Sequence, residues 1–275
     1  GSTQDVTTTI HADARQSDAS SGIGLTVDMF GTKAMAASDA TFGGIRLLAI
    51  LGDGTLYEMY SGLPSTGSYE FAAGDTSGDA VDEILTMAQG AVPTTGIVLW
   101  LNDGYGNFSA ASGTGLPTFG AYRDALLVDL NYDTAMDLLA INDTTDRVEP
   151  FIGLGPNTFA ALPEIDASTT ALRFAVADFD SDGNDDIAYL LANGFRIYIG
   201  APASLPSPPY SFAADFSSPA AGWTAPRDIA AADMNGDGVP DVVIARDQYL
   251  EVFLGAGETH VAGNAEADRV PSAEI

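Results

Sequence analysis

Acidic side chains recur at fixed spacing in four nine-residue segments of this sequence. The segments begin at Asp75, Asp129, Asp178 and Asp233, and each has an acid at positions 1, 5 and 9 and another oxygen-bearing side chain at position 3. The alternation places the side chains of positions 1, 3 and 5 on the same side of a tightly curved backbone. The acid at position 9, at the start of the next strand, can bind the same ion. Such an oxygen set suits a hard cation. Calcium fits better than magnesium, which demands octahedral geometry and keeps its waters.

The predicted ligands are the side chains at positions 1, 3, 5 and 9 together with the backbone carbonyl at position 7. In chain order they are Asp75, Ser77, Asp79, Val81 and Glu83; Asp129, Asn131, Asp133, Ala135 and Asp137; Asp178, Asp180, Asp182, Asn184 and Asp186; and Asp233, Asn235, Asp237, Val239 and Asp241. Glycine at position 6, present in the last two segments, accepts the positive φ of a sharp turn. We predict about four calcium sites, best formed in these two segments, and none in an eroded copy that begins at Asp39.

A single Asp-rich turn is more commonly a solvated turn whose Asp side chain bonds its own backbone. Four copies in one register favour metal binding over that alternative. The residues after position 9 are typical of a strand, so the helix–loop–helix context of an EF-hand is excluded.

Runs typical of β-strands flank every acidic segment. Small apolar residues precede it, as in residues 174–177, and hydrophobic runs follow it, as in residues 187–191 and 195–199. Four short strands about every 50 residues predict an all-β fold, a β-propeller of four-stranded antiparallel blades. About five such units cover residues 34–254.

The units also suggest how the chain begins and ends. We expect residues 1–275 to form a single domain in which segment 1–30 closes the last blade and segment 258–275 is a C-terminal tail. The first unit has no room for a separate fourth strand, because residues 71–73 run directly into the acidic segment at Asp75.

These repeats resemble a known family. Residues 176–187 (VADFDSDGNDDI) and 232–242 (ADMNGDGVPDV) look like the FG-GAP/VCBS repeats of integrin-α-type propellers, and residues 101–108 are similar to the turn after the third strand in many VCBS copies. The resemblance implies an extracellular or surface-displayed propeller whose blades are stapled by calcium on one face. Relatives commonly have seven blades, whereas this chain length favours five.

Charge and composition exclude several classes of protein. The chain has 10 Lys and Arg against 38 Asp and Glu, a formal net charge of −28, which repels nucleic acid and anionic membrane surfaces. It has no cysteine, so disulfides, thiolate nucleophiles and cysteine-ligated metals are excluded. No apolar run approaches the ~20 residues that span a bilayer as a helix. Together with the resemblance to FG-GAP/VCBS repeats, which implies an extracellular propeller, this leads us to expect a protein that is secreted or displayed on a bacterial-type cell surface.

Two further groups of residues are candidate ligand contacts. A cationic side chain lies five or six residues before the first Asp of three acidic segments and of the eroded copy; these residues are Arg123, Arg173, Arg227 and, before the eroded copy, Lys33. A ring of cations at the entry to the innermost strands could hold an anion or an acidic sugar. Local pairing, for instance with Asp124 or Asp228, is the favoured alternative. Trp223 lies in a loop and is a candidate sugar contact, with packing as its alternative.

The sequence thus favours a non-catalytic recognition or adhesion module for a glycan or a surface protein. A polysaccharide-active enzyme with carboxylates at the channel mouth is an alternative, although no acid pair with the ~5–9 Å separation of a glycosidase is selected. An architectural module of a larger surface protein is the third reading.

Overall fold

The computed structural model describes residues 25–29, 32–38, 45–50, 56–59, 62–64, 68–89, 96–165, 171–202, 210–219, 226–246, 249–255 and 267–271. All of the regular structure in these residues is β-strand. The described part of the chain holds no helix long and apolar enough to cross a membrane.

Twenty strands form five four-stranded antiparallel sheets, and within each sheet the strands follow one another in chain order. The first sheet contains β1 (Leu25–Met29), β2 (Thr32–Ser38), β3 (Ile45–Ile50) and β4 (Leu56–Met59), and the second contains β5 (Ser68–Gly74), β6 (Glu83–Gln89), β7 (Ile97–Asn102) and β8 (Phe108–Ala110). The third contains β9 (Tyr122–Val128), β10 (Asp137–Asn142), β11 (Arg147–Gly155) and β12 (Thr158–Ala161). The fourth contains β13 (Ala171–Ala177), β14 (Asp186–Leu191), β15 (Gly194–Pro202) and β16 (Tyr210–Pro219), and the fifth contains β17 (Pro226–Ala232), β18 (Asp241–Arg246), β19 (Tyr249–Phe253) and β20 (Ala267–Pro271).

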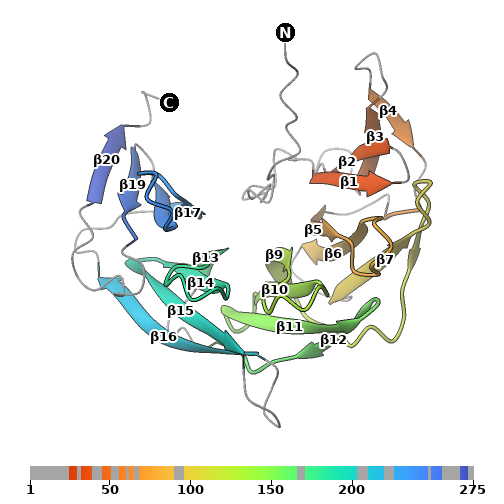
Figure 1. The fold of residues 1–275 in the computed structure, drawn as a ribbon. Coiled ribbons are helices and arrows are strands. Elements are labelled where there is room, and N and C mark those ends of the chain that lie inside the picture. Colours follow the sequence, from red (N-terminus) through yellow and green to blue (C-terminus); the bar gives the residue numbers. More distant parts are fainter. Residues whose placement is uncertain are drawn as a thin grey trace.

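The five sheets are arranged radially as blades, with β9, β13 and β17 near the centre and β12, β16 and β20 at the outside (Figure 1). This is the architecture of a β-propeller. The predicted all-β fold of four-stranded antiparallel blades is therefore confirmed, and the structure contains five such sheets.

Hydrophobic layers between neighbouring sheets form the core. In β10, Leu138 and Ala140 pack toward the second sheet, while Leu139 and Ile141 pack toward the fourth. A strand buried on both faces needs apolar residues at consecutive positions, which explains the unbroken hydrophobic run 138–141.

Hydrogen bonds also join the innermost strands of neighbouring blades. The Glu70 carboxylate accepts the backbone N–H of Asp124 at 2.5 Å, and the Asp124 carboxylate accepts the N–H of Phe174 at 3.2 Å. Asp124 is buried. These bonds satisfy backbone donors that the sheets themselves leave unpaired and tie the second, third and fourth sheets together.

The structure differs from the expected roles of the two end segments. We expected segment 1–30 to close the last blade, but β1 pairs with β2 of the first sheet, and residues 1–24 lie outside the described residues. A hairpin between β1 and β2 has a much lower loop-closure cost than a long-range pairing. In the described residues no strand separates β4 from β5, as expected, so β1 supplies the fourth strand of the first sheet from its inner side.

Segment 258–275 was expected to be a tail, but its residues Ala267–Pro271 form β20 and pair with β19. The pairing completes a four-stranded fifth sheet and covers the edge of β19. The sequence Ala-Asp-Arg-Val-Pro contains one β-branched residue, so its strand character was not evident from local preference.

The core layers predict the effect of removing one side chain. Leu139 is fully buried between the third and fourth sheets, so Leu139→Ala should lower the free energy of unfolding by about 2–5 kcal/mol, measured by urea titration in excess calcium. Phe119 is 73% exposed, and Phe119→Ala should change it by no more than about 0.5 kcal/mol. Equal effects of the two changes would contradict this packing.

Candidate metal centre

The four acidic segments occupy equivalent places in the fold. Each connects the first strand of its sheet to the second, after β5, β9, β13 and β17. Of the eroded copy, residues 39–47, the first six residues lie outside the described residues, as does Trp223. Leu47, at position 9 of this copy, is fully buried in β3. Both predictions stay predictions.

The first acid of each loop caps the loop backbone. The Asp178 carboxylate accepts the N–H groups of Asp182 and Gly183, both at 3.0 Å. The other three loops repeat this arrangement. Asp129 accepts the N–H groups of positions 5 and 6 of its loop. Asp75 and Asp233 accept those of positions 4, 5 and 6 of theirs. The position-5 carboxylate in turn accepts the N–H of position 7 in every loop, at 2.8–3.0 Å. The shared spacing of acids in the four segments thus corresponds to a shared pattern of hydrogen bonds in the four loops.

Two positions of each loop have left-handed backbone. Position 6 has φ values of 68° at Ala80, 74° at Thr134, 89° at Gly183 and 88° at Gly238, as the expected sharp turn requires. Position 4 is also left-handed, with φ values of 82°, 55°, 63° and 80° at Gly78, Tyr132, Ser181 and Gly236. Sequence reasoning missed position 4, although the glycines in two of the four loops were a signal for it.

The acid at position 9 is buried and joins three parts of its blade. Asp137 is fully buried and accepts two N–H groups, one from Leu130 in the loop at 2.9 Å and one from Gly153 in β11 at 2.7 Å. Asp186 and Asp241 are also fully buried and make the same pair of bonds in the fourth and fifth sheets. We call this arrangement the carboxylate staple.

The second sheet has a variant of the carboxylate staple. Glu83 is 2% exposed and accepts the N–H and the hydroxyl of Thr76, at 2.9 and 3.0 Å. Asn102 stands at the end of the third strand and donates its side-chain N–H to the backbone carbonyl of Asp82 at 2.9 Å. In this sheet Glu83 stands at the position of the aspartate, and Asn102 stands at the position of the glycine whose N–H the aspartate accepts in the other sheets.

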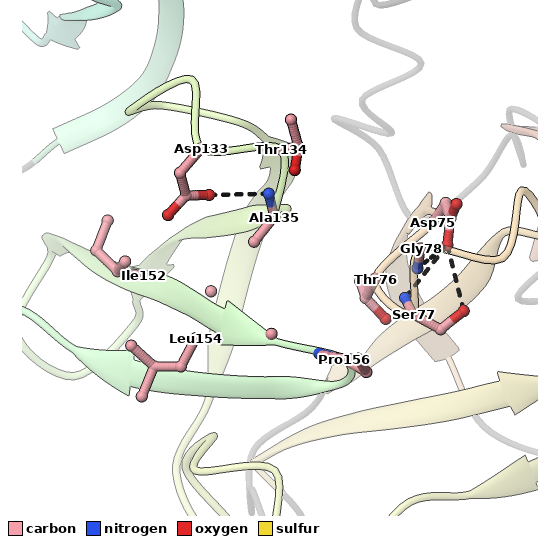
Figure 2. Close-up of a pocket in the computed structure, with 12 residues that line it drawn as sticks. Asp75, Thr76, Ser77, Gly78, Asp133, Thr134, Ala135, Ile152, Leu154 and Pro156 are labelled. Atoms are coloured by element: carbon pink, nitrogen blue, oxygen red, sulfur yellow. Dashed lines mark hydrogen bonds between the residues drawn. The ribbon is translucent and has the colours of Figure 1, made fainter.

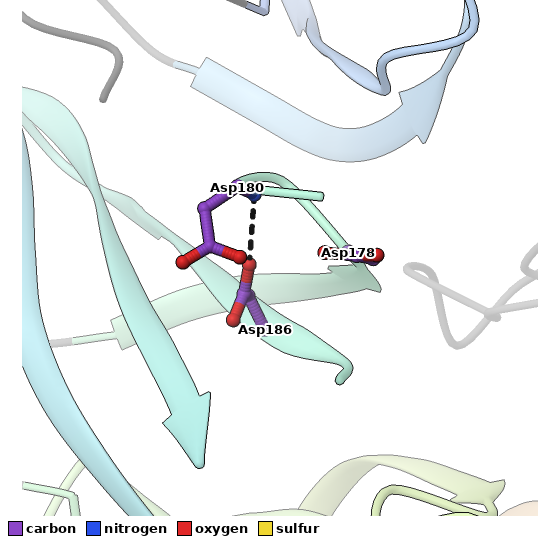
Figure 3. Close-up of side chains that lie close together, drawn as sticks. All are labelled: Asp178, Asp180 and Asp186. Atoms are coloured by element: carbon purple, nitrogen blue, oxygen red, sulfur yellow. Dashed lines mark hydrogen bonds between the residues drawn. The ribbon is translucent and has the colours of Figure 1, made fainter. Parts of the chain in front are cut away.

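One cluster of carboxylates has the spacing of a metal site. One oxygen each of Asp178, Asp180 and Asp186 lies within 4.8 Å of the others, and Figure 3 shows these three side chains with the Asp180 N–H bonded to Asp186. Calcium binds oxygens at about 2.3–2.6 Å, so two oxygens on one ion lie within about 5 Å of each other. The donor chemistry and the spacing of this triad therefore fit a metal ion.

The other loops have a neutral side chain at position 3, namely Ser77, Asn131 or Asn235. Their oxygens can still bind a hard cation, with less charge. The predicted ligand sets of all four loops, including the position-7 carbonyls, stay predictions.

Contacts between neighbouring blades link the loops. The Tyr132 hydroxyl donates to Asp185 of the next loop at 3.0 Å. The hydroxyl oxygen of Thr76 in the loop of the second sheet also lies 2.6 Å from the side-chain amide of Asn157, in the turn between β11 and β12, within hydrogen-bonding distance. These long-range contacts have no local sequence signal.

Burial dominates the titration of two position-9 acids. It raises the pKa of Asp137 to about 7, with a smaller increase from Asp133 and Asp129, against the lowering effect of the backbone donors Gly153 and Leu130. Burial likewise raises the pKa of Asp186 to about 7. Burial also raises the pKa of Glu83.

The predicted cationic ring is only partly described. Arg123 makes ion pairs with Asp143 at 2.6 Å and Asp146 at 3.2 Å and donates to the Ala171 carbonyl at 2.8 Å. Local pairing thus holds Arg123, with different partners from the expected Asp124.

The structure describes the side chains of two of the other three members of the ring. Arg173 donates to the carbonyl of Leu172, and Arg227 is exposed. The side chain of Lys33 lies outside the described residues. A ligand bound by this ring stays a prediction.

Comparisons with known proteins agree with this geometry. Residues 129–189 match the FG-GAP-like repeat and residues 225–261 match the FG-GAP repeat. The chain therefore contains FG-GAP repeats, which are typical of integrin-α-like β-propellers. No curated protein has a matching sequence.

Several solved structures share the fold. One is a lectin of Agrocybe aegerita, whose structure describes specific recognition of non-reducing terminal N-acetylglucosamine; it has a TM-score of 0.61 and 19% identity, over 87% of this chain and 64% of the lectin. Another is a proposed 6-phosphogluconolactonase of Bacteroides uniformis, with a TM-score of 0.56 and 13% identity, over 94% of this chain and 79% of that one. At these identities the similarity shows a shared β-propeller fold. The chain spans less than two thirds of the lectin's length.

The Asp178 triad predicts a graded response to substitution. Asp180→Ala should remove one equivalent of bound calcium, measured by calorimetric titration and by metal content after gel filtration. Asp180→Asn should keep weaker binding, because it gives this loop the position-3 amide of the loops at Asp129 and Asp233. The matched control is Asp185→Asn, a change at a position outside the predicted ligands, which should retain the full stoichiometry. Full stoichiometry in Asp180→Ala would contradict the site.

The buried acids predict the pH dependence of stability without calcium. The folded-state pKa of about 7 for Asp137 and Asp186 lies above the unfolded value of about 3.9. Their contribution to stability is therefore full below about pH 4 and is lost as the pH rises through 7. In EDTA the melting temperature should be higher at pH 5.5 than at pH 8.

Two controls separate this effect from general charge repulsion. The higher melting temperature at pH 5.5 than at pH 8 should persist in 0.5 M salt, which screens exposed charges. Saturating calcium should weaken or reverse it, because a metal requires deprotonated ligands. A calcium-free protein that melts at a higher temperature at pH 8 would show that these acids titrate normally.

Proposed function

We propose that this protein is an extracellular, calcium-stabilised β-propeller that binds glycans without catalysing a reaction. The observation that carries the proposal is the repetition of one loop geometry in four neighbouring blades, with the Asp178 triad as its most acidic copy. The loops present carboxylate, amide and hydroxyl oxygens beside one another, which suits a ligand rich in hydroxyl groups.

About four calcium ions would be bound, with the loops at Asp178 and Asp233 as the best sites. The first has three clustered carboxylates, and the second has glycine at both left-handed positions, Gly236 and Gly238. A bound ion neutralises carboxylates that otherwise repel one another. Binding to the folded state alone stabilises it by about 2.7 kcal/mol per site at a hundredfold excess over Kd.

An extracellular location is supported by the accessibility of the loops. Asp79, Asp133, Asp182 and Asp237 at position 5 are all exposed. Such open sites favour modest affinity, and extracellular calcium modules work at about 10⁻⁴–10⁻³ M. The acidic surface, with a net charge of −28, favours a partner that is not a polyanion.

The glycan reading is supported by the shared fold with the Agrocybe aegerita lectin. Glycans that end in N-acetylglucosamine are therefore the first probes to use. A surface protein that carries such glycans would be bound through the same sugars.

A glycan array tests the proposal. The calcium-saturated protein should bind a defined set of neutral glycans, and EDTA should abolish binding because the loops that present the ligand lose their ions. Incubation with the bound glycans should release no new reducing ends. An array without any specific binding would contradict the proposed function, and release of reducing ends would replace it with a glycan-cleaving enzyme.

A further inference from the structure

One side-chain contact joins the acidic loops of the third and fourth blades. The Tyr132 hydroxyl donates to the Asp185 carboxylate at 3.0 Å. Tyr132 is position 4 of its loop and Asp185 is position 8 of the next loop, and both lie outside the predicted ligand sets. We infer that Tyr132 is a positioning residue that couples the two calcium sites, so that an ion in either loop strengthens binding in the other. The inference rests on the proposed calcium-stabilised propeller and deepens it.

Each partner of the contact lies between two predicted ligands. Tyr132 lies between the ligands at positions 3 and 5 of its loop, and Asp185 lies between those at positions 7 and 9 of the next loop. An ion in either loop therefore fixes the backbone that carries one partner of the bond. The second ion then binds to a loop that is already partly ordered, which gives positive coupling. Because a coupling free energy is reciprocal, each site gains by the same factor.

The backbone of Tyr132 is unusual for a residue with a side chain. Its φ of 55° is left-handed, a region that residues other than glycine seldom adopt. Gly78 and Gly236 have this position in the loops of the second and fifth blades. Tyrosine therefore occurs here in spite of its backbone preference, in the loop from which its side chain reaches the neighbouring one.

Electrostatics keep the hydroxyl a donor and place the contact close to both sites. Burial and, after it, Asp185 raise the pKa of Tyr132 to about 12, so the hydroxyl is protonated at neutral pH. Burial raises the pKa of Asp185, whereas the bond from Tyr132 lowers it. Asp178 and Asp129 raise it further. These two acids are the first predicted ligands of the two loops, so the contact lies in the field of both sites.

The other pairs of consecutive loops differ in sequence at the two positions. Positions 4 and 8 are Gly78 and Met136 between the second and third blades, and Ser181 and Pro240 between the fourth and fifth. Figure 2 shows the loops of the second and third blades, where both loops line a cavity of about 470 Å³ and the hydrogen bonds drawn stay within each loop. The loop of the fifth blade is therefore an internal reference for the coupled pair.

Calcium titration of the full chain, followed by two-dimensional NMR, measures each loop separately. The amide signals of Thr134, Gly183 and Gly238, all at position 6, report on the loops of the third, fourth and fifth blades. Tyr132→Phe keeps the ring and removes the hydroxyl. It should raise the calcium midpoints of the first two signals about fivefold and leave the third unchanged. The two ions also repel each other, but this repulsion is the same in the variant, so the difference isolates the bond.

Variants of the acceptor separate the bond from the charge. Asp185→Asn and Asp185→Ala both remove the carboxylate charge, and only asparagine keeps an acceptor for the hydroxyl. The Gly183 midpoint should therefore be higher in Asp185→Ala than in Asp185→Asn. Adding Tyr132→Phe should raise it further beside Asp185→Asn and should leave it unchanged beside Asp185→Ala.

A third variant tests the coupling itself. Asp133→Ala removes a predicted ligand of the third-blade loop, and it should raise the Gly183 midpoint in the otherwise unaltered chain. It should not do so in a chain that also carries Tyr132→Phe. The matched control is Tyr105→Phe, at an exposed tyrosine in the turn between β7 and β8, which should change none of the midpoints.

Three results would overturn the inference. They are an unchanged Gly183 midpoint in Tyr132→Phe, an equal increase of the Gly238 midpoint, and an effect of Asp133→Ala that persists without the hydroxyl. Loops that bind calcium but titrate independently would refute only the coupling and leave the proposed function standing. If none of the three signals responds to calcium, the calcium-stabilised propeller and the coupling both fail.

Discussion

The buried carboxylate at the end of each acidic loop is the interaction on which the rest of a blade depends. Asp137, Asp186 and Asp241 are fully buried, a placement that is unfavourable unless the charge is hydrogen-bonded. Each accepts one amide from its own loop and one from a glycine that lies in the third strand or, for Gly255, two residues after it. A single side chain on the second strand thus fixes the loop against the third strand, and the loop shape that gathers the remaining oxygens follows from it.

Glycine is the second half of this carboxylate staple. A Cβ atom on Gly153 would lie 2.5 Å from the Met136 carbonyl oxygen, and one on Gly255 would lie 2.4 Å from that of Pro240. The third strand can therefore bring its amide to the acid only where no side chain intervenes. The second blade confirms this dependence by changing both partners together: Asn102 stands in place of the glycine, and the longer Glu83 bonds back to Thr76 instead. The acid and the glycine form one unit, although 14 to 16 positions separate them in the sequence.

The sequence predicted what short-range pattern controls and missed what long-range pairing controls. The acidic register and the unbroken hydrophobic run 138–141 are local properties, and both are present in the structure, the run as a strand buried on both faces. The pairing of β1 with β2 and of β20 with β19 was missed, because the formation of a short strand depends more on the sheet edge with which it pairs than on the preferences of its own residues. The Tyr132–Asp185 contact between loops was missed for the same reason. The calcium ligand set of each loop stays a prediction from the sequence.

The acidity of the chain has two physical origins that the net charge alone does not distinguish. Fifteen of the 38 acids lie in the four loops, and those at positions 1 and 9 are already engaged by backbone amides. Each carboxylate oxygen has two lone pairs, so an oxygen that accepts an amide can still bind a cation. The amides hold the loop in shape, and an ion that enters finds oxygens already gathered, with little ordering left to be done. The same acids therefore serve the fold and the metal centre, and a substitution among them should be judged by which of the two bonds it removes.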